Sequence, residues 1–307
     1  MQQVVNTIVP IFVIIILGMV LKARDLLPAG IIGPLNRLVY YIAIPCMIFS
    51  AVVRASFRVD FDALLLVGTL VPVCAVFGAA FILGRLLAVR RDQMGTFLQI
   101  SFHGNLGYIG LAVCFYFAGQ AGFARASILA GFLMLLQNLL AVIGLQAFSE
   151  AEDAGRRIGF LTKRVVGNPV ILSTLFAMAY ALLKLPLPAI LERSLDIIGG
   201  MALPLALLVI GASLSFGLIR THIRLALGAG LLKLLVLPGL GLLAYRLMGL
   251  PPDQYLPGVV LLATPTATVA YVMAGEIHGS KDLATAAIST ITLLSCLTYL
   301  FWLSFWS

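Results

Sequence analysis

Charged side chains are scarce in this sequence. Only 10% of the 307 residues are charged, whereas 62% are hydrophobic and the mean hydropathy is +1.10. A soluble protein of this size carries about 25% charged residues, so the composition excludes a soluble domain and indicates an integral membrane protein. The net charge of +8 does not indicate a nucleic-acid partner, because the cations lie in short loops between apolar runs.

The sequence also lacks the motifs of several other functional classes. No G-x-x-x-x-G-K-[S/T] loop is present, so ATP does not drive this chain directly, and no H-E-x-x-H motif or Cys/His cluster indicates a metal enzyme. The 4 cysteines lie in apolar runs, which predicts buried thiols and no disulfide. The first twenty residues lack a basic region and a cleavage site, so they indicate a retained span. We therefore expect no enzymatic activity, no cofactor and no metal.

Long apolar runs dominate what is present. A helix needs about 20 apolar residues to cross a hydrocarbon core of roughly 30 Å. The fold class predicted on this basis is an all-α integral membrane protein with ten transmembrane helices, at residues 4–21, 31–53, 62–89, 94–118, 124–148, 165–183, 193–217, 222–248, 254–277 and 283–306.

The 20 lysine and arginine residues are distributed unequally between the two sides of these spans. Two of them, Arg37 and Lys233, lie inside spans 2 and 8. Twelve lie on one side, namely Lys22, Arg24, Arg85, Arg90, Arg91, Arg156, Arg157, Lys163, Arg164, Arg220, Arg224 and Lys281. Six lie on the other, namely Arg54, Arg58, Arg125, Lys184, Arg193 and Arg246. The positive-inside rule places the set of twelve in the cytoplasm and both termini outside. We expect a multi-pass protein of the cell inner (cytoplasmic) membrane.

The two halves of the chain repeat each other at a nearly constant offset. Pro10 matches Pro169, A-I-P at 43–45 matches A-L-P at 202–204, and Ser56-Phe57 matches Ser215-Phe216, all at offset 159; A-R-A-S-I at 124–128 matches A-T-A-A-I at 284–288 at offset 160. Each predicted half, 1–150 and 151–307, holds five spans, which is an odd number. The second half must therefore lie inverted in the membrane, as in secondary transporters.

The fourth span of each half is interrupted at the same place. The first interruption is S-F-H-G-N-L-G-Y-I-G-L at 101–111 and the second is A-T-P-T-A-T-V-A at 263–270, with Asn105 matching Thr264 at offset 159. Glycines that merely allow close helix packing are the alternative explanation. Two broken helices in corresponding positions instead predict a midplane binding site, where two half-helix N-termini favour an anion such as a carboxylate.

The predicted site combines backbone and side-chain groups of both interruptions. We expect backbone N–H groups near Gly104–Gly107 and Pro265–Thr268 to solvate the anion. Further hydrogen bonds are expected from the side chains of Asn105, Thr264, Thr266 and Thr268. Neither interruption contains Asp or Glu, so a cation is disfavoured as the main cargo.

Lys233 lies roughly 18 Å into span 8, counted from Thr221 at about 1.5 Å per residue. An intramembrane lysine marks an ion or substrate pathway. It either pairs with the anion or takes the place of a coupling cation at the carbonyl end of a broken helix. Gln137, Asn138 and His103 are candidates for support or for coupling: His103 could carry a proton, although interhelical hydrogen bonding alone also explains such residues.

The chain resembles the auxin efflux carrier family over essentially its whole length. The motifs that carry the resemblance are N-L-G-Y-I-G-L (105–111), A-T-P-T-A-T (263–268), A-I-P (43–45) and N-P-V-I-L (168–172). The family includes plant auxin carriers and bacterial malonate and malate permeases. The resemblance implies a five-plus-five inverted fold similar to bile-acid symporters, with spans 1, 2, 6 and 7 as scaffold and spans 3–5 and 8–10 as the transport domain. It further implies a homodimer through the scaffold, Asn105 as the crossover asparagine and Pro265 as the second crossover proline. Ala112 departs from the proline that many members have after I-G-L.

The predicted function is secondary active transport of small organic anions by elevator-type alternating access. Malonate- or malate-type carboxylates or auxin-like acids are the expected cargo, and membrane lipid is the surrounding partner. The coupling ion is left open between H⁺ and Na⁺. The alternatives are a sodium-coupled symporter of bile-acid-like amphipathic anions and a non-transporting membrane sensor or channel.

Overall fold

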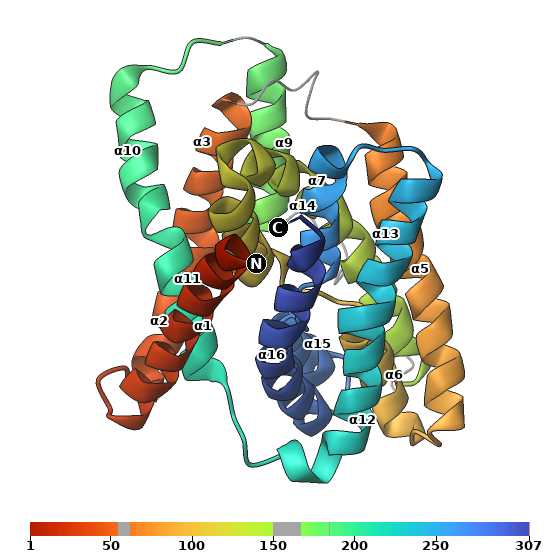
Figure 1. Ribbon diagram of the computed structural model, residues 1–307. Helices are drawn as coiled ribbons and strands as arrows, with labels where there is room; N and C mark the ends of the chain where they lie inside the picture. The colour runs from red at the N-terminus through yellow and green to blue at the C-terminus, as the bar shows by residue number, and fades with distance from the viewer. Residues whose placement is uncertain (55–61, 150–166, 184, 307) are drawn as a thin grey trace.

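The computed structural model describes residues 1–54, 62–149, 167–183 and 185–306, and these residues form helices joined by short connections (Figure 1). The β-type pairing seen among the described residues is an isolated bridge between Gly104 and Thr266, which lies outside any strand. The all-α class is therefore confirmed for the described residues.

The first half begins with α1 (Gln2–Ala23). A second helix is assembled from α2 (Ala29–Leu38), the π-helical turn η1 (Val39–Ala43) and α3 (Ile44–Arg54). It continues through α5 (Ala63–Leu86), α6 (Arg91–Ile100), the π-helical turn η2 (Leu106–Gly110) and α7 (Leu111–Ala147).

The second half begins with α9 (Pro169–Leu182), α10 (Ala189–Gly200) and α11 (Ala202–Ser213). It continues through α12 (Ile219–Leu231), the π-helical turn η3 (Leu232–Val236) and α13 (Leu237–Leu247). Its last elements are α14 (Pro252–Leu262), α15 (Val269–Glu276), α16 (Lys281–Leu303) and the 3₁₀ turn η4 (Ser304–Trp306).

Side chains from the local sequence determine where several helices begin. The Asp62 carboxylate accepts hydrogen bonds from the N–H groups of Leu64 and Leu65, and Ser280 accepts one from the N–H of Leu283. Asn168 caps α9 in the same way and is followed by Pro169, which has no N–H to satisfy. Such caps satisfy donors that have no partner inside the helix.

Seven helices in the described residues are long and apolar enough to cross a membrane: Gln2–Ala23, Ala29–Arg54, Ala63–Leu86, Leu106–Ala147, Ala189–Ser213, Ile219–Leu247 and Lys281–Trp306. They cover predicted spans 1, 2, 3, 5, 7, 8 and 10. Predicted spans 4 and 9 are each divided into two shorter helices. Predicted span 6 corresponds to α9, which has 14 described residues. The ten-span count stays a prediction.

A sharp turn separates predicted spans 4 and 5. The helix from η2 through α7 is interrupted at Gly119, where φ is 67° and ψ is −166°. A residue with a side chain rarely adopts this conformation, so the glycine allows the chain to reverse direction there.

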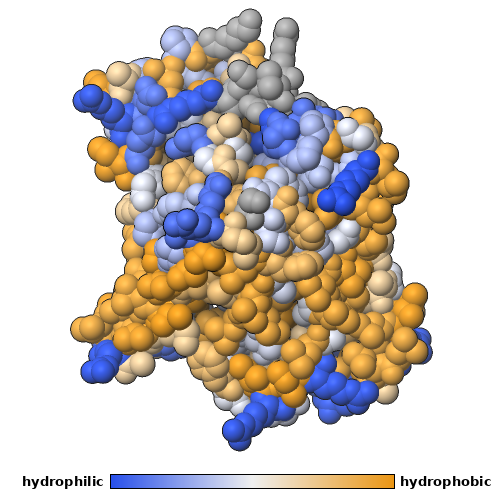
Figure 2. Space-filling model, viewed as in Figure 1, coloured by the Kyte–Doolittle hydropathy of each residue, from blue (hydrophilic) through white to orange (hydrophobic). Residues whose placement is uncertain are grey.

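The outer surface is strongly apolar. Large hydrophobic side chains such as Val13, Phe176 and Ile197 are more than half exposed, at 55%, 63% and 77%. Figure 2 shows hydrophobic residues across the middle of one face and hydrophilic residues gathered toward its two ends. This distribution suits a protein surrounded by lipid.

The helices pack in two groups. In one group α1 packs along α11, and α3 packs against α9 and α10; in the other, α12 packs along α16, α6 and α14 pack against α7, and α5 packs against α13 (Figure 1). The groups meet where α1 contacts α7 and α16 and where α3 contacts α7.

Some sequence predictions lie outside the described residues. They are the Ser56-Phe57 side of one repeat match, the junction between the halves at 152–157, and the predicted positions of Arg58, Arg156, Arg157, Lys163, Arg164 and Lys184.

Candidate functional site

The two interruptions lie against each other in the interior. We call residues 101–105 the first segment and residues 263–268 the second segment. Asn105 donates its N–H to the carbonyl oxygen of Pro265 (2.8 Å), and Ala267 donates its N–H to the carbonyl oxygen of His103 (2.9 Å). Gly104 and Thr266 face each other between these bonds in antiparallel orientation. Backbone groups that lost their helical partners thereby find partners in the opposite segment, as a non-aqueous interior requires.

Four helix ends meet at this pairing. The α6 and α14 helices end there with their carbonyl groups, whereas η2 and α15 begin there with their N–H groups. The first N–H groups of a helix have no partner inside that helix, and the N-terminal end carries a partial positive charge. Thr266 compensates one of the carbonyl ends, because its hydroxyl donates to the carbonyl oxygen of Ile100 (2.9 Å).

Gln137 of α7 supports the first segment from the side. Its Oε1 accepts the N–H of Gly104 (3.1 Å), and its Nε2 donates to the carbonyl oxygen of Phe102 (3.1 Å). The side chain is fully buried. One amide group thus satisfies a donor and an acceptor that the broken helix leaves open, so the structure gives Gln137 a supporting position.

Lys233 reaches the carbonyl end of α14 from the π-helical turn η3. Its Nζ donates to the carbonyl oxygen of Leu262 (2.7 Å) and lies 3.4 Å from the hydroxyl oxygen of Thr264, which itself donates to the carbonyl of Leu261 (2.7 Å). The lysine side chain is 0% exposed. A cation at a helix C-terminus interacts favourably with the negative end of the helix dipole.

Gly104 allows the first segment to approach this lysine. A Cβ added at position 104 would overlap the Thr264 hydroxyl oxygen and would lie 3.2 Å from the Lys233 Nζ. Here glycine is required for a close approach rather than for an unusual φ angle. Gly107 differs, because a Cβ there would meet only the Met134 Cε at 3.5 Å, an ordinary contact distance.

Asn105 forms the turn from the first segment into η2. Its φ and ψ of −78° and 70°, with a bond from Leu106 N–H to the Gly104 carbonyl (2.9 Å), define an inverse γ-turn. The side chain is 6% exposed, and its Nδ2 has no hydrogen-bond partner among the described residues. A buried amide without a partner is rare in proteins, which makes Asn105 a candidate for contact with a ligand.

Comparison with known proteins identifies the family. A family model described as "Membrane transport protein" matches residues 3–303. The chain belongs to this membrane transport protein family. The resemblance to the auxin efflux carriers is thereby confirmed, and the chain is a multi-pass membrane transport protein rather than an enzyme.

Three relatives align over nearly the whole chain. A "Putative malonate transporter" of Rhizobium meliloti (strain 1021) is 29% identical over 97% of this chain and 94% of that protein. An "Uncharacterized transporter" of Methanothermobacter thermautotrophicus is 26% identical over 97% and 96% of the two chains. An uncharacterized transporter of Methanocaldococcus jannaschii is 20% identical over 97% of each chain.

Other predicted site residues have varied positions in this transporter. His103 is buried, and its Nδ1 lies 3.4 Å from the Nε2 of Gln99. Thr268 is the N-cap residue of α15, but its side chain does not cap the helix. Asn138 is buried in α7, and within the described part of the chain its side chain forms no hydrogen bond with either segment.

Sequence reasoning missed one contact beside the first segment. The Tyr108 hydroxyl donates to the Oδ1 of Asn36 in α2 (2.6 Å). This bond joins η2 to the other group of helices. Because 72 residues separate the two positions, no local sequence signal could have indicated the pair.

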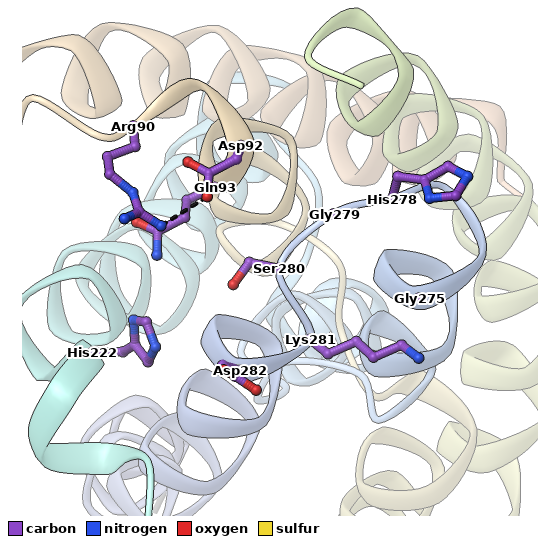
Figure 3. A pocket seen from close by; sticks show the side chains of 10 residues that line it. All are labelled: Arg90, Asp92, Gln93, His222, Gly275, His278, Gly279, Ser280, Lys281 and Asp282. Carbon is purple, nitrogen blue, oxygen red and sulfur yellow. Dashed lines mark hydrogen bonds and ion pairs between the residues drawn. The ribbon is translucent and has the colours of Figure 1, made fainter. Parts of the chain in front are cut away.

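A surface cavity of about 590 Å³ lies at the far ends of α6 and α15 (Figure 3). Its lining includes Arg90, Gln93, His222, Lys281 and Asp282, and none of the predicted site residues. Arg90 is already paired with Asp92 (2.7 Å). At about 1.5 Å per residue, the ten-residue helix α6 places the first segment roughly 15 Å from this opening.

Proposed function

We propose that this transporter carries small organic anions by secondary active transport, with the anion bound where the first and second segments pair. The observation that carries the proposal is the pairing itself, since it brings two helix N-termini and Lys233 to one buried place. Helix N-termini that point at anionic substrate groups near the midplane are characteristic of secondary transporters.

The electrostatics of the site favour an anion over a cation. The two segments contain no Asp or Glu, and the ion pairs of Arg54 with Glu192 and Asp196, and of Arg90 with Asp92, lie outside both segments. A carboxylate could accept N–H groups of η2 and α15 together with the unpaired Nδ2 of Asn105.

The fold supports an alternating-access mechanism. We infer ten spans in two inverted repeats, with α6–η2 and α14–α15 as the broken fourth span of each half. One group serves as the scaffold and contains α1, α3, α9, α10 and α11. The other group moves with the anion and contains α5, α6, α7, α12, α13, α14, α15 and α16. Both segments and Lys233 belong to the second group, so the site travels as one unit in an elevator-type motion.

The polar cavity at the far ends of α6 and α15 serves as the cytoplasmic entrance in this proposal. Arg90 and Lys281 line it and belong to the more basic side of the protein. We infer from that asymmetry that both termini lie outside, and we propose the inner membrane as the location. A homodimer through the scaffold group completes the proposed assembly.

The cargo proposed first is a malonate- or malate-type carboxylate, ahead of an auxin-like acid. The support is the relative whose name is "Putative malonate transporter", which aligns over 97% of this chain.

Sodium coupling, the main rival, is disfavoured by the position of Lys233. Carbonyl ends of broken helices coordinate the coupling cation in sodium-driven carriers. Here the lysine Nζ already occupies the carbonyl end of α14, 2.7 Å from the Leu262 oxygen.

The proposal is tested by counterflow in proteoliposomes. Purified protein is reconstituted with unlabelled malonate, malate or an indole acid inside, and entry of the same labelled compound is measured with sodium or potassium outside. We expect saturable counterflow of a small carboxylate that is equal in both salts. Asn105→Ala should reduce it strongly, whereas Asn6→Ala, the same change at an exposed position of α1, should not.

Two outcomes would contradict the proposal. Wild-type counterflow by Asn105→Ala would show that the anion does not bind at the paired segments. Counterflow only with sodium, or flux without stimulation from the opposite side, would favour the sodium-coupled symporter or the channel.

A further inference from the structure

The charge of the empty site is determined by four helix ends and one lysine. A helix end carries about half an elementary charge, negative at the C-terminus and positive at the N-terminus. The ends of α6 and α14 and the beginnings of η2 and α15 therefore cancel to first order. What is left is the charge of Lys233, about +1 when its amine is protonated.

No acidic side chain in the described residues balances this lysine. Among the described residues, Lys233 is the charged residue whose side chain is fully buried. No Asp or Glu is buried among them. Its nearest partners, the Leu262 carbonyl and the Thr264 hydroxyl, are dipoles without net charge. The first segment covers the amine at close range, because a Cβ on Gly104 would lie 3.2 Å from Nζ.

An uncompensated charge makes movement of the empty site through the membrane costly. Charged groups inside a bilayer are expensive unless they are paired. A bound anion with one negative charge brings the sum to zero, whereas an anion with two charges reverses the sign and restores the cost. The loaded site therefore has the lower barrier to reorientation when its cargo carries a single negative charge.

We propose that Lys233 is the fixed counter-charge of the transported anion, so that the carrier works mainly by exchange and moves its cargo with one net negative charge. This inference rests on the proposed function. The lysine acts across Gly104 and Thr264 rather than by direct contact, because its amine is already hydrogen-bonded and has no exposed surface. Lys233 supplies the compensating charge without touching the cargo, and the two segments make the contacts with the carboxylate.

The first test compares exchange with net uptake of labelled malonate in proteoliposomes at zero membrane potential. Exchange is measured with malonate inside, and net uptake without it. In wild type, the rate of malonate exchange should be about tenfold or more above the rate of net malonate uptake. Each tenfold ratio of rates corresponds to a fixed difference in barrier height, here between the loaded and the unloaded site. Lys233→Met should bring the ratio close to one, and Lys233→Arg should keep it high. Lys22→Met, which removes an exposed cation at the end of α1, should leave it unchanged.

The second test needs no variant. In wild-type vesicles with the same pH on both sides, a tenfold malonate gradient should be balanced at about 59 mV if each malonate crosses with one net negative charge, as the monoanion or as the dianion together with one proton, and at half that voltage if it crosses as the dianion alone. A ratio near one in wild type, an unchanged ratio in Lys233→Met, or the half-size voltage would overturn the inference. Absence of carboxylate counterflow would instead contradict the proposed function itself, so the two failures are distinguishable.

Discussion

Replacing Gly104 with alanine is the most demanding test of the paired segments. The added Cβ would overlap the hydroxyl oxygen of Thr264 and press against the Lys233 amine, so the segments would have to move apart. A separation of the order of 1 Å is enough to cost about 10²-fold in function when a site depends on positioning. Overpacking of a close-packed interior costs typically 1–3 kcal/mol, and the pairing bonds at 2.8 and 2.9 Å would be stretched.

The assay is counterflow of labelled malonate together with thermal unfolding of the purified protein. We expect Gly104→Ala to reduce counterflow by about 10²-fold and to lower the melting temperature. Gly107→Ala is the matched control, because its Cβ would meet Met134 at 3.5 Å and needs no movement. A second change, Thr264→Ala, removes the overlapping oxygen and should partly restore the Gly104→Ala protein.

Full activity and stability in Gly104→Ala would refute the geometry of the paired segments. Equal losses in Gly104→Ala and Gly107→Ala would also contradict it, because loss of glycine flexibility rather than a close approach would then explain both. Failure of Thr264→Ala to restore any function would place the obstruction at Lys233.

Three further predictions concern Gln137, Tyr108 and Arg54. Gln137→Leu should destabilise the protein by about 1–3 kcal/mol, because it leaves the Gly104 N–H and the Phe102 carbonyl buried without partners; an unchanged melting temperature would contradict this. Gln137→Glu should be intermediate, since a carboxylate accepts one bond but donates none. Tyr108→Phe removes the bond to Asn36 between the two helix groups and should change the counterflow rate without changing carboxylate affinity; a change in affinity alone would show that the hydroxyl contacts the cargo. Arg54→Met should alter the melting temperature little, because its ion pairs are about half exposed and such pairs contribute roughly 0–1 kcal/mol; a large drop would show that they hold the scaffold group together.

The sequence by itself determined the membrane class, the helical fold and the location of the two interruptions. Composition and hydrophobic run length are properties of the chain alone, and the requirement for internal hydrogen bonding in lipid leaves helices as the way to satisfy such apolar runs. The repeat at offset 159 could likewise be read directly, and it drew attention to Asn105 and Thr264 together. Family membership was available from the motifs for the same reason.

Only the tertiary structure decided how the two segments face each other and which groups support them. The carbonyl contact of Lys233, the double hydrogen bond of Gln137 and the Tyr108–Asn36 bond all join residues at least 29 positions apart. No local pattern encodes such contacts, because they depend on which faces of separate helices are brought together. Thr268 and Asn138, which sequence reasoning grouped with the site, illustrate the same limit: only the structure shows that Thr268 is the N-cap residue of α15 without a side-chain cap and that Asn138 is buried in α7.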